Sequence, residues 1–145
     1  MAAAGRDVPL QVQVTIELTG RMLPGTEMSA AIAALDPLGP DVLGINCATG
    51  PAFMTDHLRA LSELSHVPVA CVPNAGLPDE EGCYQEGPEE LATAIGDFVD
   101  AGWINLVGGC CGTTPEYTRA IVAAVAGKLR HAARQGARVP IAQIA

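Results

Sequence analysis

The chain has 145 residues, of which 49% are hydrophobic and 17% are charged, and its formal net charge at pH 7 is -8. This composition excludes a disordered chain and predicts one modest globular domain. The acidic charge excludes a protein that binds phosphate backbones through clustered Lys and Arg, and no apolar run approaches the roughly 20 residues that cross a bilayer. Five cysteines, an odd number, and the lack of a signal-peptide pattern favour reduced thiols and a cytoplasmic location.

Strand and helix patterns alternate along the chain. β-branched residues in alternation predict a first strand, and nearly continuous apolar runs predict three buried parallel ones. The predicted strands are residues 10–16, 42–46, 67–72 and 103–107. A short alanine-rich helix is predicted over residues 28–35. Three further helices should begin at Pro51, Pro88 and Pro115, because proline suits the first helical position and here follows Gly or Thr.

Apolar spacing predicts which faces of the last two helices are buried. The predicted core stripe of the helix from Pro88 comprises Leu91, Ile95, Phe98 and Val99, and that of the helix from Pro115 comprises Ile121, Val122, Val125 and Leu129. Gly102 stands where a left-handed helix cap is usual. Residues 8–127 thus form the predicted domain, and residues 128–145 a tail to which no structure is assigned.

Four successive strand–helix units predict an α/β fold with a parallel sheet and right-handed crossovers. Two architectures fit: a small open sheet, or half of a (β/α)8 TIM-type barrel. A complete barrel takes about 200 to 250 residues. In both, the loops at the carboxyl ends of the strands carry function.

Three cysteines fall at those strand ends. Cys47 follows the second predicted strand, and Cys110 and Cys111 follow the fourth. Three thiolates predict a zinc site with one open position, which distinguishes catalytic zinc from structural zinc. A zinc-bound thiol is deprotonated and becomes a nucleophile. We expect the glycines around the cysteine pair to adopt positive φ and allow close approach, so that consecutive side chains reach one metal; they are Gly108, Gly109 and Gly112.

Other interpretations of the thiols stay open. The adjacent pair is also compatible with a redox-active vicinal dithiol or a structural role, and its glycine-rich loop with a phosphate cradle, although the P-loop lysine is absent. Cys71, inside a strand, is expected to be a small core residue, and Cys83 an incidental exposed thiol. The histidines are expected to be structural or solvated; they are His57, His66 and His131.

Three segments together resemble the homocysteine S-methyltransferases, and within them the cobalamin-dependent methionine synthases. The segments are Gly44-Ile45-Asn46-Cys47-Ala48, residues 73–78 (Pro-Asn-Ala-Gly-Leu-Pro) and residues 108–115 (Gly-Gly-Cys-Cys-Gly-Thr-Thr-Pro). The narrower likeness to the methionine synthases is supported by residues 14–16 (Val-Thr-Ile), 19–21 (Thr-Gly-Arg) and 23–25 (Leu-Pro-Gly). The resemblance implies a (β/α)8 barrel with zinc on Cys47, Cys110 and Cys111. It also implies that Asn74 orients homocysteine. Asn46 and Gly109 complete the expected substrate-binding set. Asn46 is the weaker candidate, and we expect it to hold its loop rather than to bind the substrate.

The resemblance covers residues 8–127 and matches only the carboxyl-terminal half of the barrel, strands five to eight. It implies zinc-dependent methyl transfer to the thiol of homocysteine, giving methionine, with methylcobalamin as donor in the full-length enzyme and 5-methyltetrahydrofolate upstream. The expected partners are the amino-terminal barrel half and the cobalamin and folate modules, in cis or in trans. The alternatives are S-methylmethionine or betaine as donor, or a non-catalytic zinc- or thiol-binding half-domain.

Overall fold

The structure is a computed structural model that describes residues 8–47 and 49–128. Its strands are β1 (Gln11–Val14), β2 (Val42–Asn46), β3 (Val69–Val72) and β4 (Leu106–Val107). Its helices are α1 (Met28–Leu35), α2 (Pro51–Leu64), α3 (Pro88–Asp100) and α4 (Pro115–Val125), with a short 3-10 helix, η2 (Asp36–Leu38), after α1. The strands form one parallel sheet in the order β1-β2-β3-β4. The predicted α/β class with a parallel sheet is therefore confirmed.

All three prolines predicted to open helices stand at the first helical position. Side-chain hydrogen bonds cap the starts of α3 and α4 in different ways. Thr114 accepts a hydrogen bond from the N–H of Glu116 (3.3 Å), and Glu90 accepts one from the N–H of Gly87 (2.8 Å). Gly102 follows α3 with φ +75°, in the predicted left-handed cap.

Strand β4 is shorter than predicted, because a hydrogen bond from β3 goes to a side chain instead of to the main chain before β4. The N–H of Asn105 donates to the Val69 carbonyl (2.8 Å), and the Asn105 side-chain oxygen accepts from the Val69 N–H (2.9 Å). The ladder proper begins only at Leu106. In α4, the predicted core residue Val122 is only half-buried, and the predicted Leu129 lies outside the described residues.

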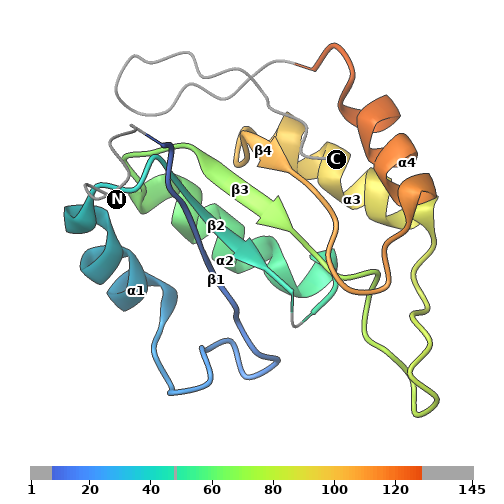
Figure 1. Cartoon of the computed structure of the whole chain (residues 1–145), viewed down its shortest axis with the longest axis horizontal. Helices are drawn as coiled ribbons and strands as arrows, with labels where there is room; N and C mark the ends of the chain where they lie inside the picture. The colour runs from blue at the N-terminus through green and yellow to red at the C-terminus, as the bar shows by residue number, and fades with distance from the viewer. Residues whose placement is uncertain (1–7, 48, 129–145) are drawn as a thin grey trace.

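One face of the sheet packs against the helices and forms the core. In Figure 1, α2 lies behind β2 and β3, and α3 and α4 lie side by side. The core includes Leu43 and Ile45 of β2, Leu58 of α2 and the predicted stripe of α3. Cys71 of β3 is fully buried among them, as predicted, and burial raises the pKa of its thiol.

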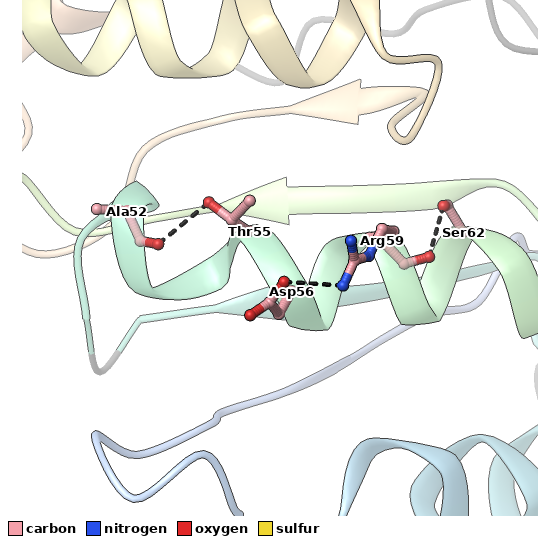
Figure 2. A network of polar contacts seen from close by, with 5 residues as sticks. All are labelled: Ala52, Thr55, Asp56, Arg59 and Ser62. Atoms are coloured by element: carbon pink, nitrogen blue, oxygen red, sulfur yellow. Dashed lines mark hydrogen bonds and ion pairs between the residues drawn. The ribbon is translucent and has the colours of Figure 1, made fainter.

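The solvent-facing side of α2 carries local polar contacts (Figure 2). The Thr55 hydroxyl donates to the Ala52 carbonyl (3.1 Å), Arg59 pairs with Asp56 (3.0 Å), and the Ser62 hydroxyl donates to the Arg59 carbonyl (2.7 Å). Exposed pairs of this kind stabilise a helix only slightly. None of the helices in the described part of the chain is long and apolar enough to cross a bilayer.

The opposite face of the sheet carries small and polar residues. A Cβ on Gly44 would lie 2.7 Å from the Cβ of Ala70, so β2 and β3 leave no room for a side chain there. Gln11, Gln13, Val72 and Gly109 help to line a concavity of about 270 Å³ on this face. The loops that follow β2, β3 and β4 gather at one end of the sheet, at the lower right of Figure 1.

Candidate metal centre

Three cysteine side chains meet at the carboxyl ends of the strands. Cys47 directly follows β2, and Cys110 and Cys111 lie in the loop between β4 and α4. The three sulfurs all lie within 4.8 Å of one another. The Cys47 and Cys111 sulfurs are 3.6 Å apart, and those of Cys110 and Cys111 are 3.8 Å apart. Every cysteine in the described residues is a free thiol.

This spacing fits a tetrahedral metal. Zinc–sulfur bonds of about 2.3 Å at tetrahedral angles place neighbouring sulfurs about 3.8 Å apart, close to both measured distances. The cluster in the described residues consists of the three cysteines, with no His, Asp or Glu among them. Three thiol ligands fit a site that keeps its fourth position for a substrate.

Cys47 reaches the cluster through an unusual backbone conformation. Its φ is +58°, which makes it the one described non-glycine residue in the left-handed region. Its N–H donates to the Val72 carbonyl (3.0 Å), and its own carbonyl accepts from the Thr49 N–H (2.7 Å). A left-handed L-residue costs about 1–2 kcal/mol, so the surrounding hydrogen bonds must hold it there.

Main-chain hydrogen bonds tie the three loops together. The Asn74 N–H donates to the Thr49 carbonyl (3.4 Å), which joins the loops after β3 and β2. The Cys110 N–H donates to the Pro73 carbonyl (2.8 Å), and the Ala75 N–H donates to the Cys111 carbonyl (3.0 Å). The loop after β3 therefore lies between the two cysteine-bearing loops and sets their separation.

The glycines around the cysteine pair differ in function. Gly112 has φ +79°. Gly109 is needed for close approach instead, because a Cβ there would lie 2.5 Å from the Thr113 hydroxyl. The positive φ predicted for Gly108 and Gly109 is wrong: neither has one, and a Cβ on Gly108 would make only an ordinary 3.7 Å contact with Val72. Thr113 closes the loop by donating from its hydroxyl to the Cys110 carbonyl (2.7 Å).

Burial raises the pKa of Cys110 to about 11, and a hydrogen bond with Cys47 is the next cause. The neutral thiol is therefore favoured in the protein alone. A bound cation reverses this preference, because it deprotonates a coordinating thiol.

Asn74 is the most distinctive polar residue near this end of the sheet. The residue is 4% exposed, and its side-chain amide oxygen accepts no hydrogen bond from any residue that the structure describes. A buried acceptor without a partner costs about 1–3 kcal/mol, and such groups in folded proteins call for an explanation such as a ligand.

The other predicted substrate residues are placed differently. The Asn46 side-chain oxygen accepts from the Thr15 hydroxyl (3.2 Å), which ties the end of β2 to the segment after β1. This contact agrees with the expected loop-holding role. Gly109 lines the concavity on the face of the sheet opposite the helices.

The other two cysteines, Cys71 and Cys83, and the described histidines lie outside the cluster. Cys83 is exposed, as predicted. The His66 ring pairs with Asp36 (2.6 Å), and His57 lies beside Gly20. His131 lies outside the described residues.

One residue at the site was not predicted from the sequence. Tyr84, in the loop between β3 and α3, lies against the cysteine cluster. Burial, then the charge of Cys111 and a hydrogen bond with its side chain, raise the pKa of the Tyr84 hydroxyl. A single aromatic residue in a polar loop has no periodicity, so no pattern in the sequence indicated it.

Comparisons with known proteins identify relatives of this chain. Residues 1–125 match the sequence model of the family described as homocysteine S-methyltransferase. Methionine synthase from Mycobacterium leprae is 53% identical over 129 residues, which are 87% of this chain and 11% of that protein. Methionine synthase from Mycobacterium tuberculosis is 51% identical over 129 residues, with the same coverage. The chain thus spans about 11% of the length of these curated relatives.

A solved structure is also similar. The metallated form of the homocysteine methyltransferase MmuM from Escherichia coli matches with a TM-score of 0.61 and 25% sequence identity. The match covers 84% of this chain and 37% of that one.

Proposed function

The chain belongs to the homocysteine S-methyltransferase family, and from that membership we propose that it forms the metal- and thiol-binding part of a homocysteine S-methyltransferase. The convergence of Cys47, Cys110 and Cys111 at one end of the sheet carries the proposal. The sulfur spacing fits tetrahedral zinc, and a similar solved structure is a metallated methyltransferase.

In this proposal the three cysteines hold Zn²⁺ and leave one position for the substrate sulfur. Bound zinc would keep the homocysteine sulfur as a thiolate near neutral pH, where a free thiol with a pKa of about 8.5 is mostly protonated. The homocysteine thiol releases its proton to water, and its sulfur forms a bond to the methyl carbon. The bond between that carbon and the donor breaks, its electron pair stays with the donor, and the product is methionine. The reaction needs reduced thiols, so we place the protein in the cytoplasm.

Asn74 is proposed to orient homocysteine. Its buried side-chain oxygen accepts no hydrogen bond from the described residues, and such an acceptor suits a donor on the substrate. Gly109 would bring its backbone close to the ligand, because Thr113 excludes a side chain there. Asn46 would act indirectly, through the bond that it accepts from Thr15.

We propose methylcobalamin, recharged from 5-methyltetrahydrofolate, as the methyl donor of the longer protein. The resemblance of the sequence to the cobalamin-dependent methionine synthases motivates this choice over S-methylmethionine or betaine, and the two relatives at 51% and 53% identity are methionine synthases. A donor screen with the longer protein distinguishes the three.

Residues 8–127 are proposed to be strands five to eight of a (β/α)8 barrel. In the described part of the chain, β1 and β4 each pair on one side only, and the match covers 37% of the similar methyltransferase structure. The amino-terminal half, supplied in cis or in trans, would pair with these edges and complete the substrate site.

Zinc content tests the proposal. The purified chain should hold about one zinc, and Cys47→Ser should lose it, because two thiols bind zinc far more weakly than three. Cys83→Ser is the matched control, since Cys83 is exposed and lies outside the cluster. Calorimetry should then show homocysteine binding to the zinc form only. If Cys47→Ser retains both zinc and homocysteine affinity, the proposal is wrong.

A further inference from the structure

The loop that carries Tyr84 is held in a defined shape. Pro78 and Tyr84 pair in an antiparallel bridge, and the Asp79 N–H donates to the Cys83 carbonyl (2.9 Å). The Asp79 carboxylate accepts from the N–H groups of Glu81 (3.0 Å) and Cys83 (2.8 Å). These bonds close the loop on itself and hold Tyr84 beside Pro78.

Tyr84 packs directly on the loop that carries two of the cysteines. A Cβ built on Gly112 would lie 2.3 Å from Cγ of Tyr84 and 2.5 Å from its Cδ2, so the ring occupies the space of the missing side chain. Gly112 directly follows Cys111. The Cys111 side chain raises the pKa of the Tyr84 hydroxyl, and Cys47 and Cys110 add to this effect, so the ring directs its hydroxyl toward the sulfur cluster.

Cys111 is the most exposed of the three cysteines in the cluster. An exposed thiolate is open to water, and its orientation is constrained less by packing than that of a half-buried one. The Tyr84 ring packs on Gly112, the residue next to Cys111, so it limits how far this part of the loop can move.

We propose that Tyr84 is a positioning residue, whose hydroxyl donates a hydrogen bond to the Cys111 sulfur and fixes its orientation toward the metal. The inference rests on the proposed function, because it assigns Cys111 as a ligand. A hydrogen bond to a thiolate sulfur also withdraws charge from it. Tyr84 therefore lowers the electron donation of one ligand, which leaves the metal a stronger Lewis acid toward the substrate thiol.

Cobalt substitution tests this inference, because Co²⁺ bound to thiolates has sulfur-to-metal charge-transfer bands. Tyr84→Phe keeps the ring and removes only the hydroxyl. We expect it to weaken Co²⁺ binding about 10-fold, as is typical when a group that orients a ligand is lost. We also expect the charge-transfer band to move to lower energy, because the Cys111 sulfur then donates more charge.

Tyr117→Phe is the matched control. The Tyr117 hydroxyl donates to the Glu86 carbonyl (2.7 Å) and so anchors the same loop without contacting a sulfur. Its loss should leave the band where it is in the wild type. A shift of equal size in both variants would show that Tyr84 acts only through the loop, and would overturn the inference.

A second measurement needs no Tyr84 variant. The chain has two tyrosines, so labelling with 3-fluorotyrosine gives two ¹⁹F signals that Tyr117→Phe assigns. Titration with Cd²⁺ should move the Tyr84 signal more than the Tyr117 signal, and an unmoved Tyr84 signal would contradict the inference.

Failure of the proposed function is distinguishable from failure of this inference. A wild-type chain that takes up no Co²⁺ and shows no thiolate band would overturn the proposed metal site, and the Tyr84 role with it. A wild-type chain that binds Co²⁺ with a thiolate band, beside an unchanged Tyr84→Phe, would overturn the Tyr84 role alone.

Discussion

Replacing Gly112 with alanine measures how strongly the packing of Tyr84 constrains the cysteine loop. Two effects add at this position. An L-residue at φ +79° is strained, which costs about 1–2 kcal/mol. The new Cβ would also lie 2.3 Å from the Tyr84 ring, and forcing extra volume into a packed site costs about 1–3 kcal/mol.

Gly39 separates the two effects. Its φ is +68°, and a Cβ there would meet no described residue within 4 Å. Gly39→Ala should therefore lose only the backbone part, about 1–2 kcal/mol, whereas Gly112→Ala should lose about 2–5 kcal/mol.

Urea denaturation followed by circular dichroism gives both free energies of unfolding. The difference between the two variants should largely disappear in a Tyr84→Gly background, because the ring and the Cβ of residue 84, which both clash, are then absent. Equal losses for Gly39→Ala and Gly112→Ala in the wild-type background would refute the reasoning. Such a result would mean that Tyr84 moves aside at little cost.

Two further predictions concern side chains that the fold leaves in unusual surroundings. Asn74→Ala should lower the affinity of the zinc form for homocysteine at least 10-fold. It should change stability by less than about 1 kcal/mol, because the Asn74 side-chain oxygen accepts no hydrogen bond from the described residues that would be lost. Calorimetry and urea denaturation measure the two quantities, and a stability loss without an affinity loss would assign Asn74 a purely structural role. Burial raises the pKa of Cys71 above its unfolded value of about 8.5, so the unfolded chain releases this proton first and stability should fall as the pH rises above about 8.5. Cys71→Ala should make stability less dependent on pH between 8 and 10, as measured by denaturation at each pH; an unchanged slope would contradict the assigned burial.

The convergence of the cysteines was predictable because parallel strands end at one edge of a sheet. Placing Cys47 after one strand and Cys110 after another was enough to predict that they meet. The helix starts were equally predictable, since the preference for proline at the first helical position depends only on local backbone chemistry. The bounds of β2, which reproduce the predicted ones, follow from a short apolar run with polar neighbours.

The features that sequence reasoning missed depend on contacts between distant segments. Asn105 shortens β4 by bonding to Val69 through its side chain, a choice that apolar runs do not reveal. The left-handed conformation of Cys47 depends on the carbonyl of Val72 in the next strand. Tyr84 reaches the site only because its loop folds back on itself.

The main-chain bonds between the three loops have a consequence for how this site tolerates sequence divergence. Amide and carbonyl groups are common to nearly every residue, so these bonds survive most substitutions in the loops. Evolutionary change is then limited mainly at the sulfurs themselves and where a neighbour leaves no room for a Cβ, as at Gly109 and Gly112. Many substitutions can therefore accumulate in these loops while the geometry of the site is kept. A solved methyltransferase that shares only 25% of its residues with this chain over a similar fold is compatible with that freedom.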